Sequence, residues 1–417
     1  MNKPEKKSLL RSLTLNDAVG VGLGAIIGAG IFVVTGVAAG VSGPAFLIGL
    51  IAAGIIASFN ALSSAQLAAS HPHSGGTYEY GYILLSPAFG FSAGWMFLIS
   101  KLSAAGVVAL GFGAYFYQLV PLGSPMLFSI SAVILLTGAN YFGIKKAGAL
   151  NLVIVTITLL SLIYLVFSGV SEVKLENFKP FAPFGLTGVF EAAALLFFAF
   201  TGYARIATLA EEVNEPKKTI PKAIIITIVT AILLYAAISI VAIGVIGTES
   251  MSQSHSPIQL VAVALSTPGI STVVTIGAST AMLGVLLSQI LGISRVMLAM
   301  GRRGDLPPIF ESIHNRFRVP HIGILLTGVI ILILTLLGSF EFIVRSATFT
   351  ILLYYGITNI AALKQPKNEK MYSKFIPILG LLGCIVMSFS LPLNVMISGI
   401  ALLLIGFGLR FIIRRVY

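Results

Sequence analysis

Charged residues are scarce in this 417-residue chain: Asp, Glu, Lys and Arg make up 10% of it, whereas hydrophobic residues make up 57%. A soluble domain usually carries about 25% charged residues. A surface this poor in charge cannot face water throughout, so lipid must surround most of the chain. Apolar stretches of about 20 residues recur, which is the length that a helix needs to cross the hydrocarbon core. The composition therefore excludes a soluble globular protein and predicts an all-α membrane protein.

Residues that carry catalysis or bind metals are also scarce. The single cysteine, Cys384, cannot form an intrachain disulfide. The five histidines show no metal-ligand spacing, and the chain has no Walker motif. The apolar stretches hold no paired carboxylates and no nucleophile with a base. We therefore expect no enzyme, no cofactor, no metal site and no direct use of ATP.

The apolar stretches predict about 12 transmembrane helices. They lie at about 18–40, 44–69, 86–118, 126–142, 149–169, 187–210, 222–247, 270–299, 321–338, 341–362, 375–390 and 393–412. The segments between them are polar or rich in Pro and Gly, as turns are.

Lysine and arginine are distributed unevenly between the two sides of these helices. If the N-terminus lies inside the cell, most of the 26 Lys and Arg residues fall in inner segments, and the outer loops hold only Lys174 and Lys179. This bias predicts a multi-pass protein of the cell membrane with cytoplasmic N- and C-termini. The net charge of +12 then belongs to the cytoplasmic rim and calls for no nucleic acid.

The first predicted span is unusually rich in glycine. Its glycines are Gly20, Gly22, Gly24, Gly28, Gly30 and Gly36. Such residues allow close helix packing in lipid. Alternatively, the helix is broken near Gly28–Gly30, where free backbone groups would bind a ligand carboxylate and ammonium. The sequence leaves both interpretations open.

The sixth predicted span is interrupted around Thr201–Tyr203, and the polar Arg205 follows. Two glycine-interrupted spans that lie five helices apart and begin on opposite sides of the membrane indicate an inverted repeat of five plus five helices.

Four motifs resemble those of the amino acid–polyamine–organocation (APC) transporters. GAGIF at 28–32 is similar to their G-(small)-G-I-F signature, and PHSGGTYEY at 72–80 to their P-x-S-G-G-x-Y-x-Y loop. ATLAEEVNEPKKTIPKAI at 207–224 resembles A-E-E-x-x-N-P-x-(K/R)-x-I-P-(K/R)-A-I, and RVMLAMGRRGDLP at 295–307 resembles R-x-x-x-A-M-A-R-D-G-x-L-P. The matches follow the family order, so together they are specific although each alone is weak.

The resemblance implies a LeuT-like 5+5 inverted repeat with broken helices 1 and 6, plus two peripheral C-terminal helices. It divides the chain into a cytoplasmic N-terminus at 1–17, helices 1–5 at 18–170, helices 6–10 at 187–363 and helices 11–12 at 374–413. It also implies transport of amino acids or related amines.

In that family the two broken spans hold the substrate. Carried over to this sequence, the lining consists of Ile27, Gly28, Ala29, Gly30, Ile31, Phe198, Ala199, Phe200 and Gly202. An aromatic side chain commonly closes over the substrate, and Phe198 is the candidate; the alternative is ordinary helix packing.

Two departures from the family pattern narrow the substrate and the coupling ion. Many members have an acidic residue after the G-(F/Y) pair of the sixth span, where this chain has Ala204 and Arg205. We therefore expect a neutral rather than a cationic substrate. Residues 282–284 stand where sodium-coupled relatives place hydroxyl ligands, although Ser279 and Thr280 lie within one turn. Because a hard cation needs oxygen ligands, we expect protons rather than sodium.

Lys101 lies in the middle of the third predicted span. A charge there costs at least about 2.5–3.5 kcal/mol, which marks a functional residue. We predict that Lys101 exchanges the coupled proton. The alternative is a permanently charged lysine that holds helices together through backbone carbonyls.

Three further charged positions have testable partners. Arg205 is expected either to meet a substrate carboxylate or to pair with an inner-gate acid such as Glu211. Arg345 is expected to pair with Glu341, four residues earlier on the same helix. Glu191, near the outer end of the sixth span, fits either a vestibule or a plain interfacial position.

The sequence therefore predicts a secondary active transporter of neutral amino acids that works by alternating access, with protons as the coupling ion. An amino acid exchanger of the same fold is the nearest alternative. A membrane nutrient sensor is the alternative from another class, but such a protein usually adds a cytoplasmic signalling region. The expected partners are an amino acid, protons and the lipid bilayer, and the sequence does not identify the amino acid.

Overall fold

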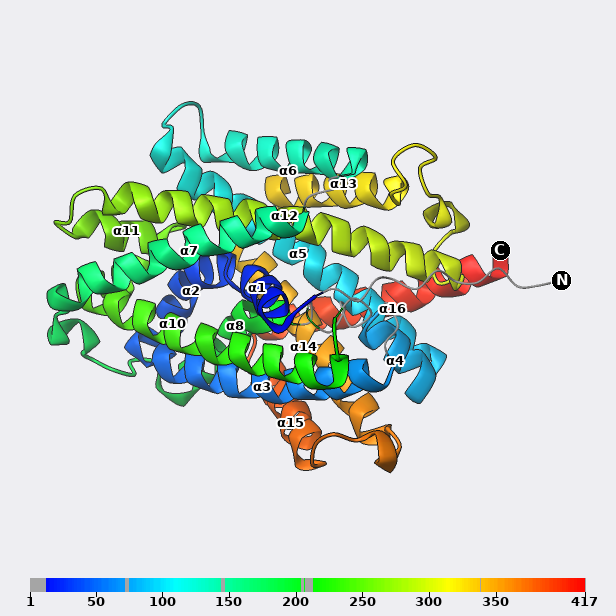
Figure 1. Cartoon of the computed structure of the whole chain (residues 1–417). Coiled ribbons are helices and arrows are strands. Elements are labelled where there is room, and N and C mark those ends of the chain that lie inside the picture. The colour runs from blue at the N-terminus through cyan, green and yellow to red at the C-terminus, as the bar shows by residue number, and fades with distance from the viewer. Residues whose placement is uncertain are drawn as a thin grey trace.

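The chain folds into a bundle of long helices that lie side by side, as Figure 1 shows for the computed structural model. The structure describes residues 13–71, 75–143, 147–203, 206, 213–337 and 339–416. Within these ranges every named element is a helix, and extended pairing is limited to an isolated bridge between Leu13 and Val213. The predicted all-α class is confirmed.

The predicted spans each correspond to helical structure. The first is divided into α1 (Leu15–Ile26), a π-helical turn (Gly30–Val34) and α2 (Thr35–Ser42). The others correspond to α3 (Phe46–Ser70), α5 (Pro87–Leu119), α6 (Pro125–Phe142), α7 (Ala147–Gly169), α8 (Gly185–Phe200), α10 (Pro216–Ser252), α12 (Ile270–Arg302), α13 (His321–Leu337), α14 (Phe340–Lys364), α15 (Phe375–Phe389) and α16 (Leu393–Val416). In the described chain, 9 apolar stretches are long enough to cross a membrane; the first covers two predicted spans, and α13 and α15 are shorter apolar helices.

Serine caps and prolines define where several of these helices begin. Ser86 accepts a hydrogen bond from the N–H of Phe89, and Ser124 accepts one from the N–H of Leu127. A proline follows each serine at the first helical position. The cap satisfies a free donor of the first turn, and proline loses nothing there because its nitrogen would have no intrahelical partner.

Two short helices were not predicted: α4 (Thr77–Leu84) and α11 (Pro257–Ala264). Eight residues are too few to give the long apolar stretch by which the spans were recognised. The chain turns into α4 at Gly75 and Gly76, whose φ angles of 129° and 56° are costly for other residues. These two helices fill the ends of the bundle and lie outside the span pattern.

The central helix of the bundle is α5, which packs along both α12 and α14. Another pair of long contacts joins α3 to α8 and to α10. Large apolar side chains such as Leu135, Phe167 and Phe389 lie exposed on the outer surface, as expected for a surface that faces lipid. This arrangement encloses the two interrupted spans.

Candidate functional site

The first span is interrupted between α1 and α2. Helix α1 ends at Ile26, Ile27 has extended backbone angles (φ −79°, ψ 103°), and the π-helical turn begins at Gly30. Among the described residues, no acceptor binds the backbone N–H groups of Gly28 or Ala29. The break proposed from the glycine pattern is therefore present, and it leaves donors available inside the bundle.

The second interruption follows α8. This helix ends at Phe200 and continues as a 3-10 turn over Thr201–Tyr203. The hydroxyl of Thr201 donates to the carbonyl of Phe198 at 3.0 Å. The predicted roles of Ala204, Arg205 and Glu211 fall on residues outside the described ranges.

The two interruptions touch through glycines. A Cβ on Gly202 would lie 2.2 Å from the carbonyl oxygen of Ala25, at the end of α1. A Cβ on Gly30 would lie 2.5 Å from the Cα of Ala199 in α8. The glycines are required here because any side chain would separate the backbones of the two broken spans.

Three buried tyrosines bind backbone carbonyls at the interruptions. Tyr235 of α10 donates to Ile26 at 2.9 Å, at the end of α1. Tyr115 of α5 donates to the π-helical turn. Tyr355 of α14 donates to Thr201 at 3.2 Å. The tyrosine hydroxyls of these three helices therefore hold in place carbonyls that a broken helix leaves without intrahelical donors.

The predicted lining residues lie together at these interruptions. Ile27, Ala29, Ile31 and Ala199 are buried, and the proposed aromatic lid, Phe198, is 8% exposed. Phe200 is fully buried, and its ring lies 5.4 Å from that of Tyr235, the α10 residue that donates to the Ile26 carbonyl. Gly28 faces Val285 of α12, whose side chain would lie 3.0 Å from an added Cβ.

Lys101 reaches the second interruption from the middle of α5. Its ammonium donates to the hydroxyl of Thr201 at 3.4 Å and lies 5.8 Å from the ring centre of Phe97. A contact between residues 100 positions apart is not visible in the sequence. The intramembrane lysine thus lies beside the proposed site and away from the lipid.

An ionic contact joins the middle of α8 to the first turns of α14. Arg345 binds Glu341 of its own helix at 2.9 Å, which confirms the predicted pair. Arg345 also binds Glu191 of α8 at 3.1 Å. Glu191 therefore joins the two helices, a role that the sequence did not distinguish from an interfacial one.

Of the two α12 hydroxyls near residues 282–284, that of Ser279 is buried and has no hydrogen-bond partner among the described residues. The hydroxyl of Thr280 donates back to its own helix, to Ile276 at 2.8 Å, and Val285 faces Gly28. No group of three or more His, Cys, Asp or Glu side chains that could hold a metal occurs in the part of the chain that the structure describes.

A separate cavity of about 500 Å³ lies away from the interruptions. Its lining is neutral and mostly polar: Ala114, Gln118, Pro125, Ser250, Gln253, Ser254, His255, Ser256 and Leu260. None of the predicted lining residues belongs to it. We place the candidate site at the interruptions because free backbone donors and the half-buried Lys101 occur there.

Comparisons with known proteins show the family of the chain. The family model for amino acid permeases matches residues 13–411. An uncharacterized transporter of Mycobacterium tuberculosis is 38% identical over 98% of this chain and 93% of its own length. The branched-chain amino acid permease BcaP of Bacillus subtilis is 30% identical over 98% of this chain and 94% of its own length. The methylthioribose transporter of Bacillus subtilis is 29% identical, with coverages of 99% and 95%. The chain therefore belongs to the amino acid permease family of membrane transporters.

Proposed function

We propose that this permease moves neutral amino acids by alternating access and that their uptake is coupled to protons through Lys101. The contact between the two interrupted spans, at Gly30 and Gly202, carries the proposal. In transporters of this kind, discontinuous helices supply backbone groups for the substrate near the middle of the membrane. We also assign helices 1–5 (18–170) and 6–10 (187–363) to two inverted repeats, each beginning with a broken helix, and place both termini in the cytoplasm.

The backbone N–H groups of Gly28 and Ala29 are the proposed partners of the substrate carboxylate. Backbone donors at a helix break favour an anionic group without a charged side chain. The predicted lining residues include no acidic side chain that would favour a cationic substrate. A relative named as a branched-chain amino acid permease supports a neutral substrate, whereas one named as a methylthioribose transporter shows that similar identity accompanies other solutes.

Lys101 is the proposed proton carrier because it contacts the turn that interrupts the sixth span. Protonation changes the hydrogen bond that the Lys101 amine can make with the Thr201 hydroxyl. Proton binding and the arrangement of this turn would therefore be energetically linked. The alternative, a permanently charged lysine that positions the helices, predicts that uptake does not depend on the pH gradient.

Proteoliposome uptake driven by a pH gradient tests the coupling. We expect the gradient to stimulate wild type and Lys174→Ala, a matched change in an exposed loop, but not Lys101→Ala. Unchanged proton dependence in Lys101→Ala would overturn the coupling role. Uptake that requires amino acid on the opposite side, with no response to the gradient, would instead support the exchanger.

Thermal-shift measurements with each of the twenty amino acids test the substrate class. A ligand that binds only the folded state raises the unfolding temperature as its concentration exceeds its Kd. We expect neutral amino acids to stabilise the purified protein. Stabilisation by cationic amino acids alone would contradict the neutral substrate, and binding without transport would favour a nutrient sensor.

A further inference from the structure

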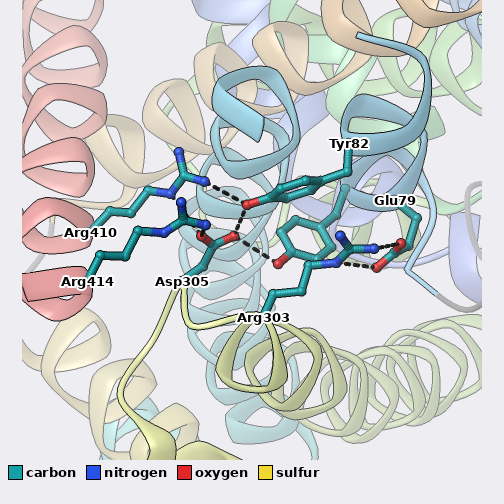
Figure 2. A network of polar contacts seen from close by, with 7 residues as sticks. Glu79, Tyr82, Arg303, Asp305, Arg410 and Arg414 are labelled. Atoms are coloured by element: carbon teal, nitrogen blue, oxygen red, sulfur yellow. Dashed lines mark hydrogen bonds and ion pairs between the residues drawn. The ribbon is translucent and has the colours of Figure 1, made fainter. Parts of the chain in front are cut away.

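Seven residues from three separate segments form a polar cluster at one end of the bundle (Figure 2). We name it the Asp305 cluster, and its members are Tyr78, Glu79 and Tyr82 of α4, Arg303 and Asp305 directly after α12, and Arg410 and Arg414 of α16. None of these residues belongs to the proposed substrate site.

The Asp305 carboxylate is fully buried, and its two oxygens bind different helices. Oδ2 accepts hydrogen bonds from the hydroxyls of Tyr78, at 2.9 Å, and Tyr82. Oδ1 accepts from Arg410 at 2.8 Å and from Arg414 at 3.1 Å. Arg410 also donates to the Tyr82 hydroxyl at 2.8 Å. One carboxylate therefore joins α4 to the C-terminal helix α16, as Figure 2 shows.

This arrangement makes the two helices depend on each other. A buried carboxylate that loses its cationic partner is strongly unfavourable, because neither water nor another charge replaces it. Burial and the hydrogen bond to Asp305 raise the pKa of Tyr82 to about 12, so the hydroxyl remains a donor. Removal of the arginines therefore leaves α4 facing an uncompensated charge.

A second ion pair strengthens the α4 side of the cluster. Arg303 donates to both carboxylate oxygens of Glu79 through one edge of its guanidinium, with Nε 3.2 Å from Oε1 and Nη2 bound to Oε2. The same guanidinium lies 4.4 Å from the ring centre of Tyr82, a favourable cation–π distance. Residues on both ends of α4 are thus tied to the segment that follows α12.

Helix α4 is in turn bonded to α14, which reaches the second interruption. The hydroxyls of Thr77 and Thr358 lie 2.7 Å apart, and the N–H of Thr77 donates to Tyr354 at 3.3 Å. The next residue of α14, Tyr355, donates to the carbonyl of Thr201. Polar contacts that are joined through the α4 and α14 backbones therefore lead from Arg410 to the turn that Lys101 contacts.

We propose that the C-terminal end of α16 positions α4 and, through α14, the second interruption, so that the transport rate depends on Arg410 and Asp305. Arg410 and Asp305 are positioning residues, and neither touches the proposed substrate site. The transport readout rests on the proposed function, whereas the structural readout below does not.

The transport test compares Arg410→Gln with Arg415→Gln, a change in the next turn of α16 at a residue that stacks on Phe411. We expect Arg410→Gln to lower the uptake rate about 5-fold or more, with amino acid binding retained, and Arg415→Gln to behave as wild type. Thr77→Ala should slow uptake similarly, and the double variant should be no slower than either single variant, because both break one chain of contacts. Wild-type uptake by Arg410→Gln, or effects of the two changes that multiply, would overturn the proposal.

Hydrogen exchange of the purified protein in nanodiscs supplies the readout that needs no substrate. We expect Arg410→Gln, but not Arg415→Gln, to speed exchange in α4 and in residues 198–203. Tyr82→Phe, which keeps the ring and loses one hydroxyl, should cause a smaller change in the same segments. Faster exchange confined to α16 would overturn the proposal, even if the protein proved not to transport amino acids. Faster exchange at both sites without amino acid uptake would support the positioning role and contradict the proposed function.

Discussion

Gly202 of the sixth span lies directly against the Ala25 carbonyl of the first span, so close that an added Cβ would be 2.2 Å from the oxygen. Gly30 and Ala199 make a second approach of this kind. The two interrupted spans are therefore in backbone contact, and their relative position leaves no room for a side chain between them.

Gly202→Ala should disturb the site itself. The new methyl group must displace the end of α1, and displacements of about 1 Å at a functional site can cost on the order of 100-fold in activity. We expect substrate affinity, measured by ligand-induced thermal shift, to fall about 10-fold or more.

Gly138→Ala in α6 is the matched control, since no described atom lies within 4 Å of its added Cβ. Alanine is favoured over glycine in a helix interior by about 1 kcal/mol. This variant should therefore bind as wild type and be at least as stable. Equal affinity in Gly202→Ala and Gly138→Ala would contradict a site at the contact between the spans.

The tyrosine hydroxyls at the interruptions should support substrate binding without contacting lipid. Tyr355→Phe removes the donor to Thr201 and leaves a buried carbonyl unsatisfied, at a cost of about 1–3 kcal/mol. We expect weaker substrate binding in Tyr355→Phe and in Tyr235→Phe, measured as a higher Kd.

Tyr164→Phe provides the comparison, because this side chain lies on the outer surface of α7. It should bind substrate with wild-type affinity. If all three variants bind equally well, the carbonyl contacts of Tyr235 and Tyr355 do not position the site.

The glycine pattern left a broken and a closely packed first span both open, and the family resemblance implied the break, but neither could predict what surrounds the interruptions. Glycines at 28 and 30 and the Thr201–Tyr203 break stand out because glycine is unfavourable in a helix interior. A tyrosine in an apolar helix gives no such signal, since its pattern is the same whether its hydroxyl faces a carbonyl or the membrane interface. The carbonyl contacts of Tyr115, Tyr235 and Tyr355 therefore became visible only in the fold.

The Asp305 cluster illustrates the same limit at a longer range. Asp305 lies within a motif that resembles the transporter family, and Arg410 fits the cytoplasmic rim that the lysine and arginine count predicts. Each residue has a sufficient local explanation, and their ion pair joins positions 105 residues apart. Local pattern cannot pair such residues, because the pairing depends on how α12 and α16 pack.

The two acids that bind Arg345 should differ in their contribution to stability. Glu191 and Arg345 are largely buried, with side chains 21% and 19% exposed, whereas Glu341 is 64% exposed. Exposed ion pairs contribute about 0–1 kcal/mol. We expect Glu191→Gln to lower the unfolding temperature of the purified protein more than Glu341→Gln does. An equal or smaller effect of Glu191→Gln would show that the contact between α8 and α14 adds no more stability than the Arg345–Glu341 pair within α14.

A buried polar contact should hold α15 against the bundle. Asn60 of α3 donates to the Cys384 sulfur at 3.3 Å, and Asn359 of α14 binds the Asn60 carbonyl oxygen at 2.5 Å. A Cβ on Gly380 would lie 2.7 Å from the Oδ1 atoms of both asparagines.

Gly380→Ala should therefore force the two amides apart and weaken the docking of α15. Breaking a buried hydrogen bond of this kind costs about 1–3 kcal/mol, so we expect a lower unfolding temperature and faster hydrogen exchange in residues 375–389. Gly408→Ala in α16 is the control, because no described atom lies within 4 Å of its added Cβ. Alanine also improves the helix propensity at both positions. A gain in stability in both variants would show that the close approach at Gly380 relaxes without cost. It would also show that the asparagine contact does not hold α15 in place.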